Sequence, residues 1–283
     1  MIDDLYNLYL QYQILFQAIF AGILASVSLG IIGTYIVSRR ISYVSGAISH
    51  CVFGGVGAGI FIQNYIGWQW FDPIYGAIIS ALVSALIIGA VTASGKNRDD
   101  AVIGAMWAVG MSVGIVFIDI TPGYFNIASY LFGDILLITG KDLLLIIVVD
   151  IFSVLAALMF YRRLMAISFD SEFAAIRGVN IRLYYILLLC LVALVTVVLV
   201  RIVGIIMVIA LLTMPAAMAS GFVNRLWHMM VISIIINIVF VISGLILSYH
   251  LALSSSAIII IILGAFYLLV AFFSRRRVNT AAN

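Results

Sequence analysis

One histidine stands inside the apolar stretch Ser45-Gly46-Ala47-Ile48-Ser49-His50-Cys51-Val52-Phe53-Gly54-Gly55, within a segment that runs from about Ile41 to Ile62. A helix needs about 20 such residues to cross the hydrocarbon core of a bilayer. His50 would then lie about 13 Å deep, at 1.5 Å per residue, near the bilayer midplane. A titratable side chain at that depth is a candidate for a ligand site or pathway. The alternative is a neutral imidazole that hydrogen-bonds to a neighbouring helix.

The composition indicates a membrane protein. Of the 283 residues, 66% are hydrophobic and 9% are charged, whereas a soluble domain has about 25% charged residues. The continuous apolar runs, about 20 residues long, favour helices over a barrel. We therefore predict an all-α polytopic transmembrane helical bundle that forms a single domain over residues 1–283.

The first residues and the two cysteines predict neither a cleavable signal peptide nor a disulfide. The acidic start, Met1-Ile2-Asp3-Asp4, has no basic region of the kind that opens a cleavable signal peptide. Cys51 and Cys190 both fall inside predicted spans, which argues against a structural disulfide or a metal finger.

The chain divides into nine predicted spans: 12–37, 43–62, 72–93, 101–119, 143–160, 183–200, 203–222, 229–248 and 255–273. Of the 14 basic residues, only Lys141 and Arg201 lie outside the loops that follow odd-numbered spans. Basic residues collect in cytoplasmic loops, so the N-terminus is expected outside and the C-terminus in the cytoplasm. The seventh span contains Gly204 and Pro215, and a proline kinks or breaks a helix. Eight full spans are therefore the alternative.

Glycines punctuate two of the spans. The spacings Gly55-x-x-x-Gly59 and Gly110-x-x-x-Gly114 predict helices that approach each other closely.

The inner loop 161–182 contains a predicted amphipathic helix at about 168–178. Phe169, Phe173 and Ile176 recur there at helical spacing. Asp170 and Glu172 lie in the first turn, where carboxylates suit the positive end of the helix dipole. Gly178 stands where a C-terminal glycine cap is expected. Such a helix either anchors the loop at the interface or docks into a partner and passes force to the spans.

This loop resembles the coupling helix of the zinc/manganese/iron permease family of ATP-binding-cassette (ABC) importers. The matching pattern is Phe169-Asp170-Ser171-Glu172-Phe173-Ala174 followed by Gly178. Further stretches that are similar to the family are residues 48–57, 99–104, 131–134 and 203–217.

The resemblance implies a type II importer-like fold in the cell membrane of a prokaryote. It also implies a homodimer of this subunit, two separate ABC ATPase subunits at the cytoplasmic face and an extracytoplasmic metal-binding protein. The lipid bilayer surrounds the chain, and no nucleic acid is expected as a partner. Phe169, Asp170, Glu172, Phe173 and Gly178 would couple it to the ATPases.

One position departs from the family pattern, which places an aspartate four residues before the histidine. Gly46 stands there in this chain. Either another carboxylate substitutes for it, or the site is softer, or it is only transiently occupied.

His50 and Asp150 are the predicted metal ligands. Imidazole suits zinc and, less selectively, manganese. Asp150 lies near mid-depth of the fifth span and is a candidate for the missing oxygen ligand, unless it only hydrogen-bonds to a neighbouring helix. Six further candidates for the path or gate are Ser49, Cys51, Asp119, Asp134, His228 and Pro215. Cys51 is more simply a small buried residue, and Asp119 and Asp134 are more simply solvated loop carboxylates.

These residues predict the permease subunit of an importer for divalent transition metals: zinc or manganese, with iron a further candidate. The ion is cargo, and no permanently bound cofactor is expected. The chain has no phosphate-binding Gly-Lys-Ser/Thr loop, so ATP hydrolysis would belong to other subunits. The alternative is an ion-coupled secondary carrier or channel, in which His50 and Asp150 form a relay. An enzyme finds no support, because no His-Glu-x-x-His motif is present.

Overall fold

The computed structural model describes residues 2–92, 99–123, 125, 127–133, 135 and 138–280, and this part of the chain is helical without strands. The helices are α1 (Ile2–Ser38), α2 (Ser42–Phe61), α3 (Pro73–Thr92), α4 (Asp99–Ile120), α5 (Ile127–Phe132), α6 (Gly140–Met159), α7 (Tyr161–Phe169), α8 (Ser171–Ile176), α9 (Ile181–Val203), α10 (Ile205–Ser220), α11 (Leu226–Leu251) and α12 (Ser255–Thr280). A π-helical turn, Ile62–Ile66, extends α2.

Eight of the described helices are long and apolar enough to cross a membrane, and the predicted seventh span is the shorter helix α10. Its 16 residues extend about 24 Å at 1.5 Å per residue, less than the roughly 30 Å of a hydrocarbon core. The helix runs through Pro215 without ending there. It packs against α1, α2, α9, α11 and α12, so its neighbours rather than lipid surround it.

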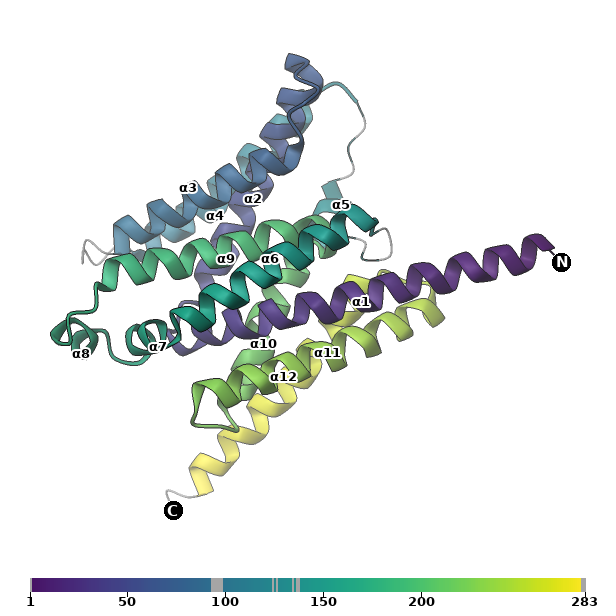
Figure 1. Cartoon of the computed structure of the whole chain (residues 1–283). Helices are drawn as coiled ribbons and strands as arrows, with labels where there is room; N and C mark the ends of the chain where they lie inside the picture. The colour runs from purple at the N-terminus through teal and green to yellow at the C-terminus, as the bar shows by residue number, and fades with distance from the viewer. Residues whose placement is uncertain are drawn as a thin grey trace.

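In the described part of the chain, α10 runs between the two ends of the bundle alongside the eight long helices. Its first residues follow Gly204, and the preceding Val203 carbonyl accepts a 3.1 Å hydrogen bond from Ser256, at the start of α12. Its last residue, Ser220, lines a groove together with Ser38, the last residue of α1, at the other end of the bundle. Figure 1 accordingly shows the start of α1 and the end of α12 at opposite ends of the bundle. We call the end with Ser38 the inner end, since most arginines lie there.

The first helix begins earlier than the sequence predicts, at Ile2 instead of residue 12. The hydropathy pattern locates only the part of a helix that lipid surrounds. The polar residues Asn7, Gln11 and Gln13 are compatible with a helix that continues beyond the bilayer. Figure 1 shows this N-terminal part of α1 reaching past its neighbours.

Helix α2 is packed between α3 and α4 with glycines on both sides. A Cβ atom on Gly54 would lie 2.6 Å from the Gly110 carbonyl oxygen of α4. On the other side, Gly55 lies directly against the backbone of Gly76 in α3. The predicted close approach is therefore confirmed, and α2, α3 and α4 form the upper group of helices in Figure 1.

Gly57 and Gly104 provide a matched test of this packing. A Cβ on Gly57 would meet the Gly114 oxygen at 2.5 Å, whereas a Cβ on Gly104 meets nothing within 4 Å. We expect Gly57→Ala to lower the free energy of unfolding by about 1–3 kcal/mol, since backbone atoms cannot move aside. Gly104→Ala should change it by no more than about 1 kcal/mol, in the stabilising direction. Thermal unfolding in detergent measures both, and equal effects would contradict the packing described here.

Candidate functional site

His50 lies in the middle of α2 and faces α4. Its imidazole is half-buried, and its ring centroid is 4.9 Å from that of Trp107, with the planes tilted by 32°. The buried Nδ1 atom has no hydrogen-bond partner among the described residues. A buried nitrogen without a partner costs free energy, so this atom is available to a ligand.

The indole of Trp107 also fills the space next to Gly46. A Cβ atom on Gly46 would lie 2.6 Å from both Cη2 and Cζ3 of that ring. Gly46 and His50 are one helical turn apart and so share a face of α2. Sequence reasoning identified Gly46 and His50 but missed Trp107, because it depends on which helix packs against α2.

The neighbours of His50 in sequence use their polar atoms elsewhere. The Ser49 hydroxyl donates to the Ser45 carbonyl of its own helix at 2.8 Å. The Cys51 thiol is buried and donates to the Met106 carbonyl at 3.4 Å. In this conformation Ser49 therefore bonds within α2, and Cys51 joins α2 to α4.

Asp150 is the second predicted ligand, and the structure does not bring it to His50. It lies on α6, beside Ser28 of α1, and is 7% exposed. Its Oδ2 atom has no hydrogen-bond partner in the described part of the chain. Helix α6 packs mainly on α1 and α9, whereas α2 packs mainly on α3 and α4. His50 and Asp150 therefore lie at two separate places in the bundle and do not form one site.

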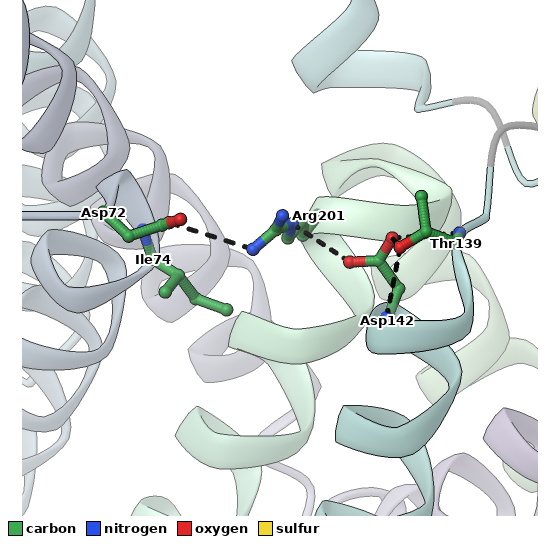
Figure 2. Close-up of polar contacts among 5 residues, drawn as sticks. All are labelled: Asp72, Ile74, Thr139, Asp142 and Arg201. Carbon is green, nitrogen blue, oxygen red and sulfur yellow. Dashed lines mark hydrogen bonds and ion pairs between the residues drawn. The ribbon is translucent and has the colours of Figure 1, made fainter.

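At the outer end an arginine joins three helices. Arg201, in the last turn of α9, lies 3.8 Å from an Asp72 oxygen and 3.3 Å from an Asp142 oxygen (Figure 2). Asp72 also accepts a 2.9 Å hydrogen bond from the backbone of Ile74, at the start of α3. Asp142 forms a capping box with Thr139 at the start of α6. Sequence reasoning noticed Arg201 only as a basic residue on the unexpected side.

A cavity of about 190 Å³ lies beside this arginine, lined among others by Val56, Asp72, Tyr130 and Arg201. Val56 is six residues beyond His50 on α2, about 9 Å along the helix axis. The cavity therefore lies outward of the imidazole. Asp119 is exposed at the outer end of α4, and Asp134 lies outside the described residues.

Two other candidates lie toward the inner end. His228 is half-buried near the start of α11, with its ring centroid 5.4 Å from that of Trp227. Pro215 is buried inside α10. The described residues contain no group of three or more acidic, histidine or cysteine side chains that could hold a metal ion.

The inner loop forms two helices where one was predicted. Asp170 has extended backbone angles, ends α7 and caps α8 by accepting a 2.8 Å hydrogen bond from the Phe173 backbone. The predicted helix 168–178 is therefore wrong in its start, and Phe169 is the last residue of α7. An aspartate at this position is more stable as a cap than inside a helix.

The predicted glycine cap of α8 is confirmed. Gly178 has φ of 76°, and the Val179 and Gly178 amides donate to the carbonyls of Ala174 and Ala175. This is the hydrogen-bond pattern of a Schellman motif. Glu172 lies in the first turn of α8, as predicted.

The cap holds an apolar surface at the inner end of the bundle. Phe173 is 50% exposed and Ile176 is 85% exposed, while Ala174 anchors the helix from below. The guanidinium of Arg177 lies 5.0 Å from the centroid of the Phe173 ring. Figure 1 shows α8 projecting at this end, away from the spans. Exposed apolar side chains outside the membrane suit contact with another protein.

Three comparisons place the chain among known proteins. The model of a family described as the ABC 3 transport family matches residues 11–274. A probable metal transport system membrane protein of Chlamydia pneumoniae is 35% identical over 83% of this chain and 80% of its own. The manganese transport system membrane protein MntC of Halalkalibacterium halodurans is 32% identical over 84% and 80%. The solved structure of PsaBC from Streptococcus pneumoniae in complex with Fab superposes with a TM-score of 0.80, at 27% identity and 95% coverage of both chains.

The exposure of Arg201 predicts a small and salt-dependent contribution to stability. Its side chain and that of Asp72 are both 48% exposed, whereas Asp142, the nearer partner, is 14% exposed. An ion pair with an exposed partner contributes at most about 1 kcal/mol. We expect Arg201→Gln to lower the unfolding temperature slightly at low salt and less at high salt, where charges are screened. Thermal unfolding at two sodium chloride concentrations measures this. A large loss of stability that salt does not change would contradict it.

Proposed function

The chain belongs to the ABC 3 transport family, and we propose that it is the membrane-spanning permease subunit of an ATP-driven importer for divalent transition metal ions. The observation that carries this proposal is the family match over residues 11–274, which includes all the long spans. The buried Nδ1 atom of His50, which has no hydrogen-bond partner among the described residues, supports an ion path through α2.

The cargo in this proposal is zinc or manganese, with iron as a further candidate. Two relatives are named as metal or manganese transport proteins. An imidazole ligand suits zinc and iron, whereas manganese prefers oxygen ligands. The ion enters from the outer end, passes His50 and leaves at the inner end.

In this proposal two copies of the chain pair in the membrane. Two ATPase subunits bind at the inner end, and a metal-binding protein delivers the ion at the outer end. The exposed Phe173 and Ile176 supply the apolar surface that an ATPase subunit would cover. ATP hydrolysis belongs to those subunits.

Force would pass from the ATPases through α8 to the spans. Helix α8 packs against α7 and α9, and α7 packs against α1 and α9. A push on α8 is therefore delivered to two long spans at once. Their movement would switch access to His50 from one side of the membrane to the other, as in alternating access.

A carrier or channel that works without an ATPase is the second candidate. It is favoured by Asp150, whose buried Oδ2 atom has no hydrogen-bond partner in the part of the chain that the structure describes and suits a proton or cation relay. Transport by the purified chain alone in liposomes would establish this alternative and overturn the importer proposal.

Truncation of the exposed surface of α8 should uncouple transport from ATP hydrolysis. We expect Phe173→Ala and Glu172→Ala each to reduce metal-stimulated ATPase activity of the reconstituted complex, by about tenfold or more for Phe173, as for an interface hot spot. Metal affinity should stay unchanged, because α8 lies far from His50. Phe222→Ala is the matched control, since Phe222 is also an exposed aromatic, 66% exposed, beyond the end of α10. Normal coupling in both α8 variants would contradict the docking role.

Replacement of the two predicted ligands tests the ion path. His50→Ala should lower zinc and manganese uptake by about 10-fold or more, because the site loses its nitrogen ligand. Asp150→Asn keeps the side-chain volume and removes the charge, so it should reduce uptake while the complex still assembles. Normal uptake in Asp150→Asn would remove Asp150 from the path and leave His50 there alone.

A further inference from the structure

The indole of Trp107 fills the space that the absent side chain of Gly46 leaves beside α2. All three heavy atoms nearest to a Cβ on Gly46 belong to the indole of Trp107, at 2.6, 2.6 and 3.3 Å. Any side chain at position 46 would therefore displace the ring. Glycine at position 46 therefore leaves the space that the indole occupies beside this turn of α2.

The same ring covers His50. The two ring centroids are 4.9 Å apart, and Trp107 is 37% exposed at the surface of the subunit. The imidazole therefore has an aromatic wall on the side of α4.

The surrounding helices offer no carboxylate at this depth. Neither α2 itself nor α3, α9 or α10, which pack against it, contain Asp or Glu. The acidic residues of α4 are Asp99, Asp100 and Asp119, at its two ends. Asp100 and Asp119 are about 10 and 18 Å from Trp107 along the axis, at 1.5 Å per residue.

The hydroxyl groups near His50 are also engaged. Ser45 and Ser49 donate to carbonyls of their own helix, at 2.7 and 2.8 Å. The described helices therefore place an imidazole nitrogen beside an indole at this depth, without a charged oxygen. Manganese and magnesium prefer carboxylate, carbonyl and water oxygens, whereas zinc suits imidazole.

We propose that Trp107, accommodated by Gly46, is a specificity-determining side chain of the ion path, which favours zinc over manganese at His50. The inference rests on the proposed function as a metal importer. The indole occupies the place from which a carboxylate one turn before His50 would reach the ion, and so keeps the site neutral.

Competition between zinc and manganese uptake in the reconstituted complex tests this assignment. We expect the wild type to prefer zinc. Trp107→Ala and Gly46→Ala should both weaken that preference, because one removes the ring and the other displaces it. The pair Gly46→Asp with Trp107→Ala should shift the ratio toward manganese by about 10-fold or more. Trp227→Ala is the matched control, since it removes an exposed indole that lies beside His228.

Tryptophan emission provides a readout that does not depend on transport or on the double variant. In the full chain with Trp68, Trp70 and Trp227 changed to Phe, Trp107 is the remaining tryptophan. Added Ni²⁺, which suits imidazole, should quench its emission, and His50→Ala should abolish the quenching. Quenching that survives His50→Ala would overturn the assignment of His50 as the metal ligand beside Trp107.

Failure of this inference is distinct from failure of the proposed function. A wild-type complex that transports metal while Trp107→Ala and Gly46→Ala leave the zinc-to-manganese ratio unchanged overturns the role of Trp107 alone. A wild-type preference for manganese does the same. A wild-type complex that moves no divalent metal overturns the importer proposal and this inference with it.

Discussion

The close packing of α2 between α3 and α4 is the constraint on which the rest of the structure depends. Lipid removes the hydrophobic drive that packs helices in water, so association depends on close contact between backbones. Gly54 provides that contact toward α4 and Gly55 toward α3. Neither contact leaves room for a side chain, so α2 is held in one rotational setting. That setting turns His50 toward Trp107 of α4.

The sequence predicted the spans well because lipid imposes a simple requirement. A helix in the hydrocarbon core needs about 20 apolar residues, and the predicted segment 72–93 begins one residue before α3, Pro73–Thr92. The requirement stops at the membrane surface. Hydropathy therefore did not predict the N-terminal part of α1. It also did not predict the break in the inner loop at Asp170, which ends one helix and caps the next by accepting a hydrogen bond from the Phe173 backbone.

The candidate site was predicted only in part, for a different reason. A buried histidine is visible in a sequence, because its cost in a membrane does not depend on the fold. Its neighbours are not visible, since they follow from which helices pack together. Trp107 lies 57 positions from His50, and no periodicity joins them. Arg201 is similar: its charge was noticed, but its two carboxylate partners are Asp72, just before α3, and Asp142 of α6.

The two ends of the bundle are held by different forces, and this difference bears on how it could move. The outer end is tied by the ion pairs of Arg201, of which the pair with Asp72 is half-exposed, and by the Ser256 hydrogen bond to Val203. Such ion pairs contribute little and exchange readily with water. The α2–α3–α4 group meets the rest of the bundle largely through α9 and α10. A rearrangement that changes access to His50 while preserving the glycine contacts must therefore move this group as one body against α9 and α10. The ion pair between Arg201 of α9 and Asp72 beside α3 spans this boundary.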